Sequence, residues 1–178
     1  NANDKTSLIQ KMNDKIIHRG PDAEGTYVDE NVALGHRRLS IIDITESGNQ
    51  PIYNEDHSIV VIFNGEIYNF QELKKELLHH TFTTNTDTEV LVHGYEEWGV
   101  ELPKKLRGMF AFAIYDKKKK QIFIARDHFG QKPFYYYKAA NEILFSSEIK
   151  SFLACPTFEK ELNKDLLGAY LTFSFTPT

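Results

Sequence analysis

A run of five apolar residues, Ile59 to Phe63, leads directly into Asn64-Gly65. Asn-Gly after an apolar run is the usual signature of a two-residue hairpin turn, which requires a returning strand. No such strand follows, because residues 66–80 are typical of a short extended piece and then a helix. We therefore predict a buried strand over Ser58–Phe63 that ends at Asn64-Gly65 without folding back.

The chain before this strand predicts one helix and two strands. Leu8, Met12 and Ile16 recur every four residues, which predicts an amphipathic helix over Thr6–Ile17. Gly20-Pro21 cannot continue a helix. Segments in which apolar and polar residues alternate then predict strands over residues 24–30 and 32–43. Turn-forming residues fill 47–54.

The chain after this strand predicts two helices with capping boxes. Asn69 precedes Glu72 by three residues, and Thr86 stands in the same relation to Glu89. Strands are predicted over 109–116, 121–127, 133–138 and 142–148, as two hairpins, and a short helix over 149–153. Because helices and antiparallel hairpins are partly segregated, the pattern favours an α+β layered fold over a doubly wound parallel sheet.

Composition narrows the class of protein. The 178 residues fit one domain, and a net charge of -4 gives no reason to expect nucleic acid as a partner. The charge run Lys117–Lys120 is interpreted as a hairpin tip. With no long apolar run, no signal-like start and one cysteine, we expect no membrane partner, no disulfide and a cytoplasmic location.

Several kinds of site find little support in the sequence. No phosphate-binding glycine loop is present. Glu89 and His93 are spaced i,i+4, but no second ligand pair completes a metal site, and His79-His80 is interpreted as a solvated helix end. We therefore predict no metal. Cys155 lies at the end of a short helix without a neighbouring cation, which favours a structural thiol over a nucleophile.

Four polar clusters remain, over residues 18–22, 35–43, 63–69 and 84–90. Taken singly, Arg38 could form a surface ion pair, Asn64-Gly65 an ordinary turn, and Asp87 a first-turn acid that complements a helix dipole. If they converge, they are complementary to a free amino acid. Arg38 would bind its carboxylate, Asp87 its ammonium, and Asn64 with the Gly65 N–H a side-chain carbonyl.

The segments HRGPDAEG, GHRRLSIID, FNGEIYN, TDTEVLVHGYEEWG, GMFAFAIYD and ARDHFGQKPFYY resemble the glutaminase domain of glutamine-dependent asparagine synthetases. That domain is a class II glutamine amidotransferase of the N-terminal nucleophile (Ntn) hydrolase type. The resemblance covers essentially the whole chain. HRGPD and RRLSIID favour the asparagine synthetase branch over the branches that serve purine or amino-sugar synthesis.

The resemblance implies a four-layer αββα sandwich of two mainly antiparallel sheets. It implies that Asn64 and Gly65 form the oxyanion hole, that Arg38 binds the glutamine α-carboxylate and that Asp87 binds the α-ammonium. The further positions that it implies around the substrate are Glu66, the main chain near Ile41 and Ile42, and Arg19 in a loop close to the nucleophile.

In this family the nucleophile is a Cys at the mature N-terminus, whose α-amino group serves as base. No such residue stands in this sequence, so we expect residues 1–178 to be a single domain cut at both ends. The family implies no cofactor here, and a C-terminal synthetase domain that uses Mg-ATP to make asparagine from aspartate. It also allows a homodimer.

Two other functions stay open at this point. The same domain could serve an asparagine synthetase-like enzyme with another acceptor of ammonia. Alternatively, because the nucleophile is absent from the sequence, the domain could bind glutamine without catalysis.

Overall fold

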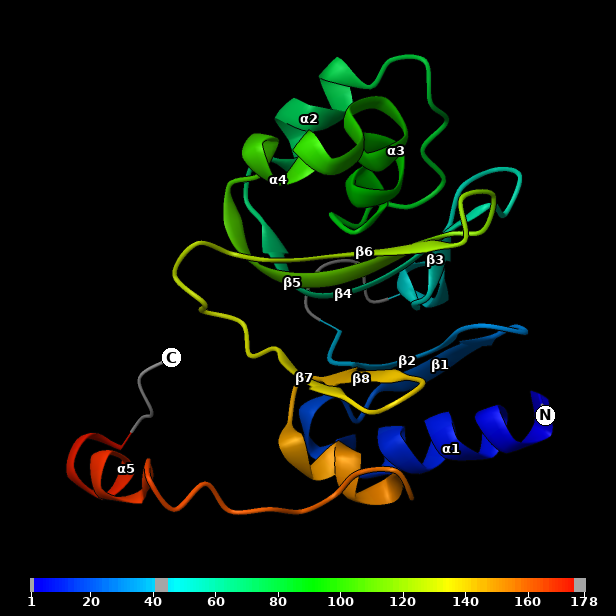
Figure 1. Ribbon diagram of the computed structural model, residues 1–178. Helices are drawn as coiled ribbons and strands as arrows, with labels where there is room; N and C mark the ends of the chain where they lie inside the picture. The colour runs from blue at the N-terminus through cyan, green and yellow to red at the C-terminus, as the bar shows by residue number, and fades with distance from the viewer. Residues whose placement is uncertain (1, 41–44, 175–178) are drawn as a thin grey trace.

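The computed structural model describes residues 2–40 and 45–174, and these form four layers (Figure 1). Helices α2 (Phe70–Glu76), α3 (Glu89–Trp98) and α4 (Leu102–Lys105) cover the outer face of a four-stranded sheet. Beneath this sheet lie two β-hairpins, and α1 (Ala2–Asp14) lies beneath them. The predicted α+β fold, with a helix–sheet–sheet–helix sandwich, is confirmed.

The upper sheet has the order β3-β4-β5-β6 and is antiparallel throughout. Its strands are β3 (Ile52–Tyr53), β4 (Ile59–Ile67), β5 (Gly108–Asp116) and β6 (Gln121–Arg126). Side chains alternate across β4, so that Val61 and Phe63 face the helices while Ile62 and Asn64 face the lower layer. The core under the helices includes Val61, Phe63, Ile67, Leu73, Leu91, Phe112 and Ile114.

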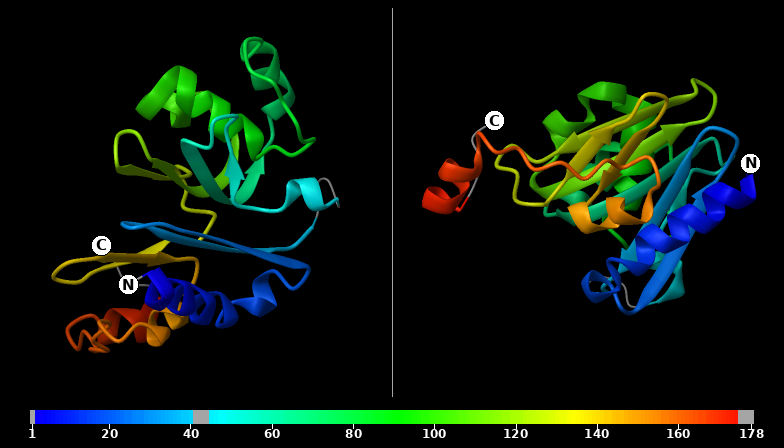
Figure 2. Two further views of the ribbon diagram at one scale, coloured as in Figure 1. Left: turned by 90° about the vertical axis from the view of Figure 1, so that its right-hand side faces the viewer. Right: turned by 60° about the horizontal axis from the view of Figure 1, so that its bottom comes forward.

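The lower layer consists of two separate hairpins among the described residues. One pairs β1 (Ala23–Val28) with β2 (Ala33–Arg38), and the other pairs β7 (Tyr135–Lys138) with β8 (Ile143–Ser146). Figure 2 shows α1 running along the face of β1 and β2 that points away from the upper sheet. The strand predicted over 32–43 is shorter where it is described, since β2 ends at Arg38, and residues 41–43 lie outside the described residues.

The remaining elements are short. Turns of 3-10 helix cover Ile17–Arg19 (η1), Glu46–Gly48 (η2), Gly99–Glu101 (η3) and Ile149–Ala154 (η4), and α5 spans Leu167–Phe173. The first helix begins and ends earlier than the predicted Thr6–Ile17. Among the described residues, no helix has the length and apolar character needed to cross a membrane.

The prediction that the buried strand ends at Asn64-Gly65 is wrong. Strand β4 runs through this dipeptide to Ile67, and Gly65 is registered opposite Phe110 of β5. A Cβ at Gly65 would overlap the Met109 carbonyl oxygen and lie 2.8 Å from Phe110 Cα. The glycine is therefore required by the close approach of β5, whatever else it does.

Neither predicted capping box forms. The Asn69 side chain accepts a hydrogen bond from the Arg107 N–H (2.9 Å) and donates one to the Lys105 carbonyl (3.0 Å). The Glu89 carboxylate accepts hydrogen bonds from Thr83 and Thr84. Asn69 thus fastens a segment that is distant in the sequence, and Glu89 fastens the loop just before α3; the spacing within one helix could indicate neither.

We expect Gly65→Ala to destabilise the domain, because the added methyl must displace the β5 backbone. The free energy of unfolding should fall by at least about 2 kcal/mol in urea denaturation. Gly168→Ala is the matched control, since a Cβ at Gly168 in α5 meets nothing within 4 Å. Equal stability of the two variants would contradict the close approach of β4 and β5.

Candidate functional site

The candidate site lies along the outer edge of β4, where the two-residue strand β3 no longer covers it. The Phe63 N–H donates to Gln50 Oε1 (2.6 Å), and the Phe63 carbonyl accepts from His36 Nε2 (3.0 Å). Four residues on, the Ile67 N–H donates to Asp87 Oδ2 (2.8 Å). Since alternate residues of a strand present their amides to the same side, the Gly65 N–H lies between these two anchoring points.

His36 and Gln50 are the residues that sequence reasoning missed. Burial lowers the pKa of His36 to about 4. The hydrogen bond to the Phe63 carbonyl acts to raise this pKa, and the nearby Arg38 charge acts to lower it further. The imidazole is therefore neutral near pH 7, with the Nε2 proton donated to the Phe63 carbonyl. The only sequence signal was a histidine inside an otherwise apolar stretch of β2, next to Arg37-Arg38.

Arg38 lies at the end of β2 and is only 7% exposed, so the alternative of a surface ion pair is wrong. Its Nη1 donates to the Thr45 carbonyl (2.7 Å) and to Asn49 Oδ1 (2.8 Å). A Cβ at Gly48 would collide with Arg38 Nη2 and lie 3.0 Å from Thr86 Cγ2. Gly48 thus lets the Arg38 guanidinium approach the segment that carries Asp87.

Asp87 is 5% exposed and precedes α3, which begins at Glu89. Burial raises the pKa of Asp87, and the charge of Glu66 adds to this, whereas the Ile67 N–H opposes it. The alternative of a first-turn acid does not describe this carboxylate, because one of its oxygens is bonded to β4. A buried carboxylate whose pKa is raised, next to another acid, is an environment suited to a positively charged ligand group.

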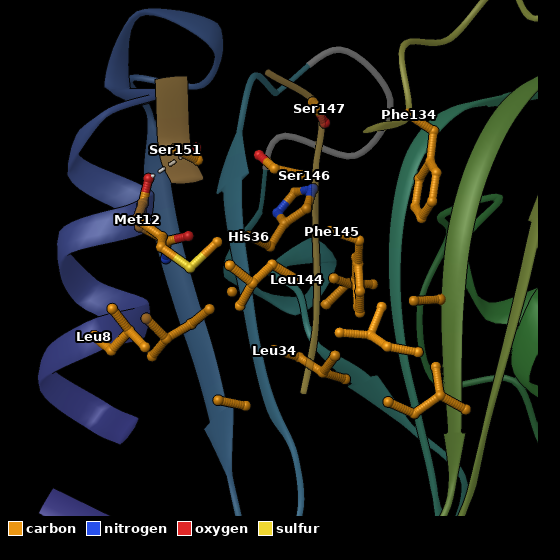
Figure 3. Close-up of a pocket in the computed structure, with 18 of the residues that line it drawn as sticks. Leu8, Met12, Leu34, His36, Phe134, Leu144, Phe145, Ser146, Ser147 and Ser151 are labelled. Carbon is orange, nitrogen blue, oxygen red and sulfur yellow. Dashed lines mark hydrogen bonds between the residues drawn. The ribbon is translucent and has the colours of Figure 1, made fainter. Parts of the chain in front are cut away.

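Asn64 points from β4 toward the lower layer. In the part of the chain that the structure describes, its Nδ2 is buried and has no hydrogen-bond partner. Asn64 also lines a cavity of about 650 Å³ that is bounded by the upper sheet, β2, β8 and α1, and which we call the central cavity. Figure 3 shows its apolar wall, to which Met12, Leu34, Leu144 and Phe145 contribute.

The other predicted positions are placed as follows. Glu66 lies on β4 one residue before Ile67, and its charge acts on Asp87. Arg19 lines the central cavity and its Nη1 lies 3.4 Å from Glu148 Oε1. Ile41 and Ile42 lie outside the described residues. Arg38, Asn64, Gly65, Glu66 and Asp87 are therefore brought along one edge of β4 and the adjoining end of β2.

Cys155 lies elsewhere, in the lower core. Its Sγ is 3.5 Å from Met12 Sδ, and it packs with Ile9, Leu144 and Phe152. Burial, with a smaller effect from the Glu142 charge, raises the pKa of the thiol to about 11. A thiol that stays protonated near pH 7 is a poor nucleophile, which supports the structural interpretation.

Comparison with known proteins identifies the family. The profile of the family described as "Glutamine amidotransferase domain" matches residues 1–178. The chain belongs to this family. Asparagine synthetase [glutamine-hydrolyzing] 1 of Bacillus subtilis is 47% identical over 176 residues, and a putative asparagine synthetase of Methanocaldococcus jannaschii is 43% identical over 190. These alignments cover 98% and 96% of the chain, respectively.

The amidotransferase chain spans only 28% and 37% of the lengths of these two relatives. Its fold is similar to that of glutamine phosphoribosylpyrophosphate amidotransferase from B. subtilis, with a TM-score of 0.68 at 18% identity. That match covers 83% of this chain and 40% of the other. The fold is accordingly of the Ntn-hydrolase type, as the resemblance implied.

The Glu89 carboxylate holds the loop that leads to Asp87. We therefore expect the free energy of unfolding to depend on the ionisation of Glu89. Burial alone would raise the pKa of Glu89, but the His93 imidazole and the donors of Thr83 and Thr84 lower it to about 2. Since the folded pKa lies below the unfolded value, the stabilisation is present above about pH 4.5 and disappears as the pH falls toward about 2.

We expect Glu89→Gln to lower the free energy of unfolding by about 2 kcal/mol at pH 7, and the difference from wild type to vanish near pH 2. Urea denaturation across this pH range measures it. Glu72→Gln, on the exposed face of α2, should have little effect at any pH. If the loss of unfolding free energy in Glu89→Gln did not change with pH, the lowered pKa of Glu89 would be contradicted.

Proposed function

We propose that this domain binds glutamine along the outer edge of β4 and hydrolyses it to glutamate and ammonia. The observation that carries the proposal is the buried, unpartnered Asn64 Nδ2 next to an edge N–H at Gly65. Leaving such a donor unpaired costs about 1–3 kcal/mol, so a ligand oxygen that accepts from it regains that energy.

The two charged groups of the substrate have matching partners. Arg38 would bind the α-carboxylate, since the Thr45 carbonyl and Asn49 hold its guanidinium in a fixed orientation. Asp87 would bind the α-ammonium, with Glu66 adding negative charge. The raised pKa of Asp87 would fall when that cation binds, so part of the binding energy comes from compensating a buried carboxylate.

The chemistry requires a thiol that is not among the 178 residues. In the proposed reaction this cysteine thiolate attacks the γ-carbonyl carbon, and the α-amino group of the same residue accepts the thiol proton. Asn64 Nδ2 and the Gly65 N–H would donate to the tetrahedral oxyanion. The tetrahedral intermediate then collapses to the thioester as ammonia leaves, taking the proton that the α-amino group had accepted, and water hydrolyses the thioester to release glutamate.

The activity of the whole protein is part of the same proposal. The two relatives reported above are named glutamine-hydrolysing asparagine synthetases and are much longer than this chain. We accordingly assign the ammonia to an ATP-dependent synthetase domain, where Mg-ATP would be bound, with asparagine as the product. A cytoplasmic location fits the same assignment.

We expect Arg38→Ala and Asp87→Ala in the full-length enzyme each to raise the KM for glutamine by at least about tenfold, because each removes one charge partner of the substrate. Asn64→Ala should instead lower kcat by about 10²–10³-fold, since the oxyanion exists only in the transition state. Steady-state glutaminase assays separate the two effects. Arg107→Ala, an exposed arginine before β5, is the matched control.

Unchanged KM values in both charge variants would show that the carboxylate and ammonium bind elsewhere. Reaction of the full-length protein with the electrophile 6-diazo-5-oxo-L-norleucine tests the thiol directly. Mass spectrometry should find one labelled cysteine, and it should not be Cys155. Binding of glutamine with no labelled cysteine would leave a non-catalytic binding domain.

A further inference from the structure

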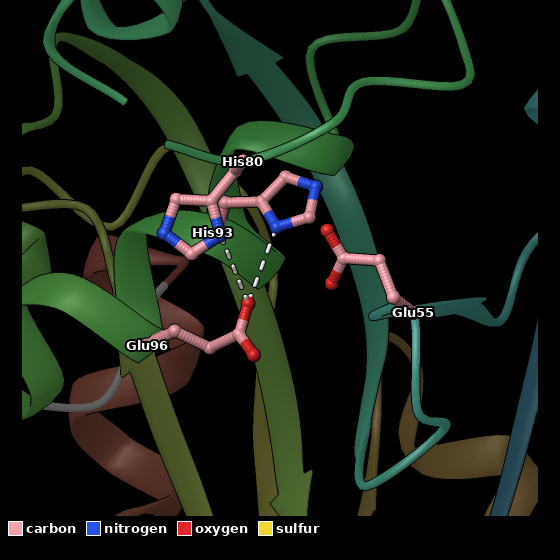
Figure 4. Close-up of side chains that lie close together, drawn as sticks. All are labelled: Glu55, His80, His93 and Glu96. Atoms are coloured by element: carbon pink, nitrogen blue, oxygen red, sulfur yellow. Dashed lines mark hydrogen bonds and ion pairs between the residues drawn. The ribbon is translucent and has the colours of Figure 1, made fainter. Parts of the chain in front are cut away.

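A second cluster of chemically reactive side chains lies on the helix-covered side of the upper sheet, away from the central cavity. It consists of Glu55, His80, His93 and Glu96, which we call the His–Glu cluster (Figure 4). Glu55 follows β3, His80 lies in the segment after α2, and the other two lie on α3. No residue of this cluster belongs to the proposed glutamine site.

The two imidazoles converge on one carboxylate oxygen. Glu96 Oε2 lies 3.2 Å from His93 Nδ1 and 3.5 Å from His80 Nδ1. Ligands held at about 2.0–2.2 Å from a tetrahedral zinc ion stand about 3.3–3.6 Å apart. The Glu96 oxygen therefore already stands at about the spacing of zinc ligands from one nitrogen of each imidazole.

Glu55 completes the set. One ligand atom from each of the four side chains lies within 4.8 Å of one from every other. Figure 4 shows the Glu55 carboxylate facing the His93 imidazole. Glu55 is exposed, and a change of its side-chain rotamer would be needed to bring its oxygen to ligand distance.

The atoms that would not contact the metal are positioned by other groups. His80 Nε2 lies 3.1 Å from Glu97 Oε1, and Asn54 Nδ2 donates to Glu96 Oε1 (2.7 Å). His93 is 1% exposed and, among the described residues, its Nε2 has no hydrogen bond, with Glu89 Oε1 at 3.8 Å. A carboxylate hydrogen-bonded to the free nitrogen of a ligating imidazole is the usual arrangement around protein-bound zinc, and Glu97 is so placed for His80.

We propose that the His–Glu cluster is a structural zinc site. Two imidazoles with two carboxylates suit Zn²⁺ rather than Mg²⁺ or Ca²⁺, which prefer oxygen ligands. Four protein ligands leave no open position for a substrate, which is the arrangement of structural rather than catalytic zinc. The ion would join the turn after β3, the segment after α2, and α3.

The sequence alone predicts no metal and interprets His79-His80 as a solvated helix end, whereas the structure places His80 in this cluster. The ligands come from three segments that are distant in the chain, so no short motif contains them. His80 also does not end a helix, since α2 stops at Glu76, and its ring packs 4.6 Å from the His93 ring. His79 is exposed, which makes it a matched control for His80.

The test is a titration of chelator-treated, full-length protein with Zn²⁺ alone, followed by calorimetry. We expect one ion per chain and a melting temperature that rises with zinc concentration. His80→Ala should weaken zinc affinity by at least about tenfold, and His79→Ala should leave it unchanged. The buried His93 is avoided, because its replacement could prevent folding.

Co²⁺ provides a second readout. Wild type and His79→Ala should show the strong visible absorption of tetrahedral Co²⁺, and His80→Ala should lose it. Absence of stoichiometric zinc binding, or equal binding by the two histidine variants, would overturn the site. Because the readout is metal binding and not glutamine hydrolysis, its failure is distinguishable from failure of the proposed function.

Discussion

The structure depends on how the backbone N–H and C=O groups on the outer edge of β4 find hydrogen-bond partners beyond the end of β3. A buried strand edge with unpaired amides is costly, and here side chains replace the missing neighbouring strand. Gln50 and His36 bond to the Phe63 peptide, and Asp87 accepts from Ile67. These bonds join the upper sheet to the lower layer and to the start of α3, and they leave Gly65 between them.

The same arrangement explains why charge is concentrated at this edge. Arg38 and Asp87 are both almost completely buried, and each is held by polar partners that fix its direction. Burial of a carboxylate raises the free energy of its charged form, so a bound cation is favoured. A zwitterionic ligand would compensate both charges at once. Under the proposed function, a small amino acid would complete this partly satisfied polar edge.

Much of this could be predicted from the sequence. Apolar alternation indicated the strands, and the family resemblance identified the fold and the residues now found along one edge. The predicted end of β4 was wrong because the sequence of one strand does not show how closely its neighbour approaches. Gly65 is required by the close β5 backbone and not by a turn. The predicted capping boxes do not form because Asn69 bonds to the distant Arg107 and Glu89 bonds to the loop before α3. His36 and the His–Glu cluster could not be found, since their roles exist only after folding.

The most direct test is a crystal structure of the full-length protein after reaction with 6-diazo-5-oxo-L-norleucine. The account predicts that the carbonyl oxygen of the adduct accepts hydrogen bonds from the Gly65 N–H and Asn64 Nδ2, at about 2.7–3.1 Å. Its α-carboxylate should contact Arg38 and its ammonium Asp87. An adduct whose carbonyl oxygen lies away from the edge of β4 would contradict the account.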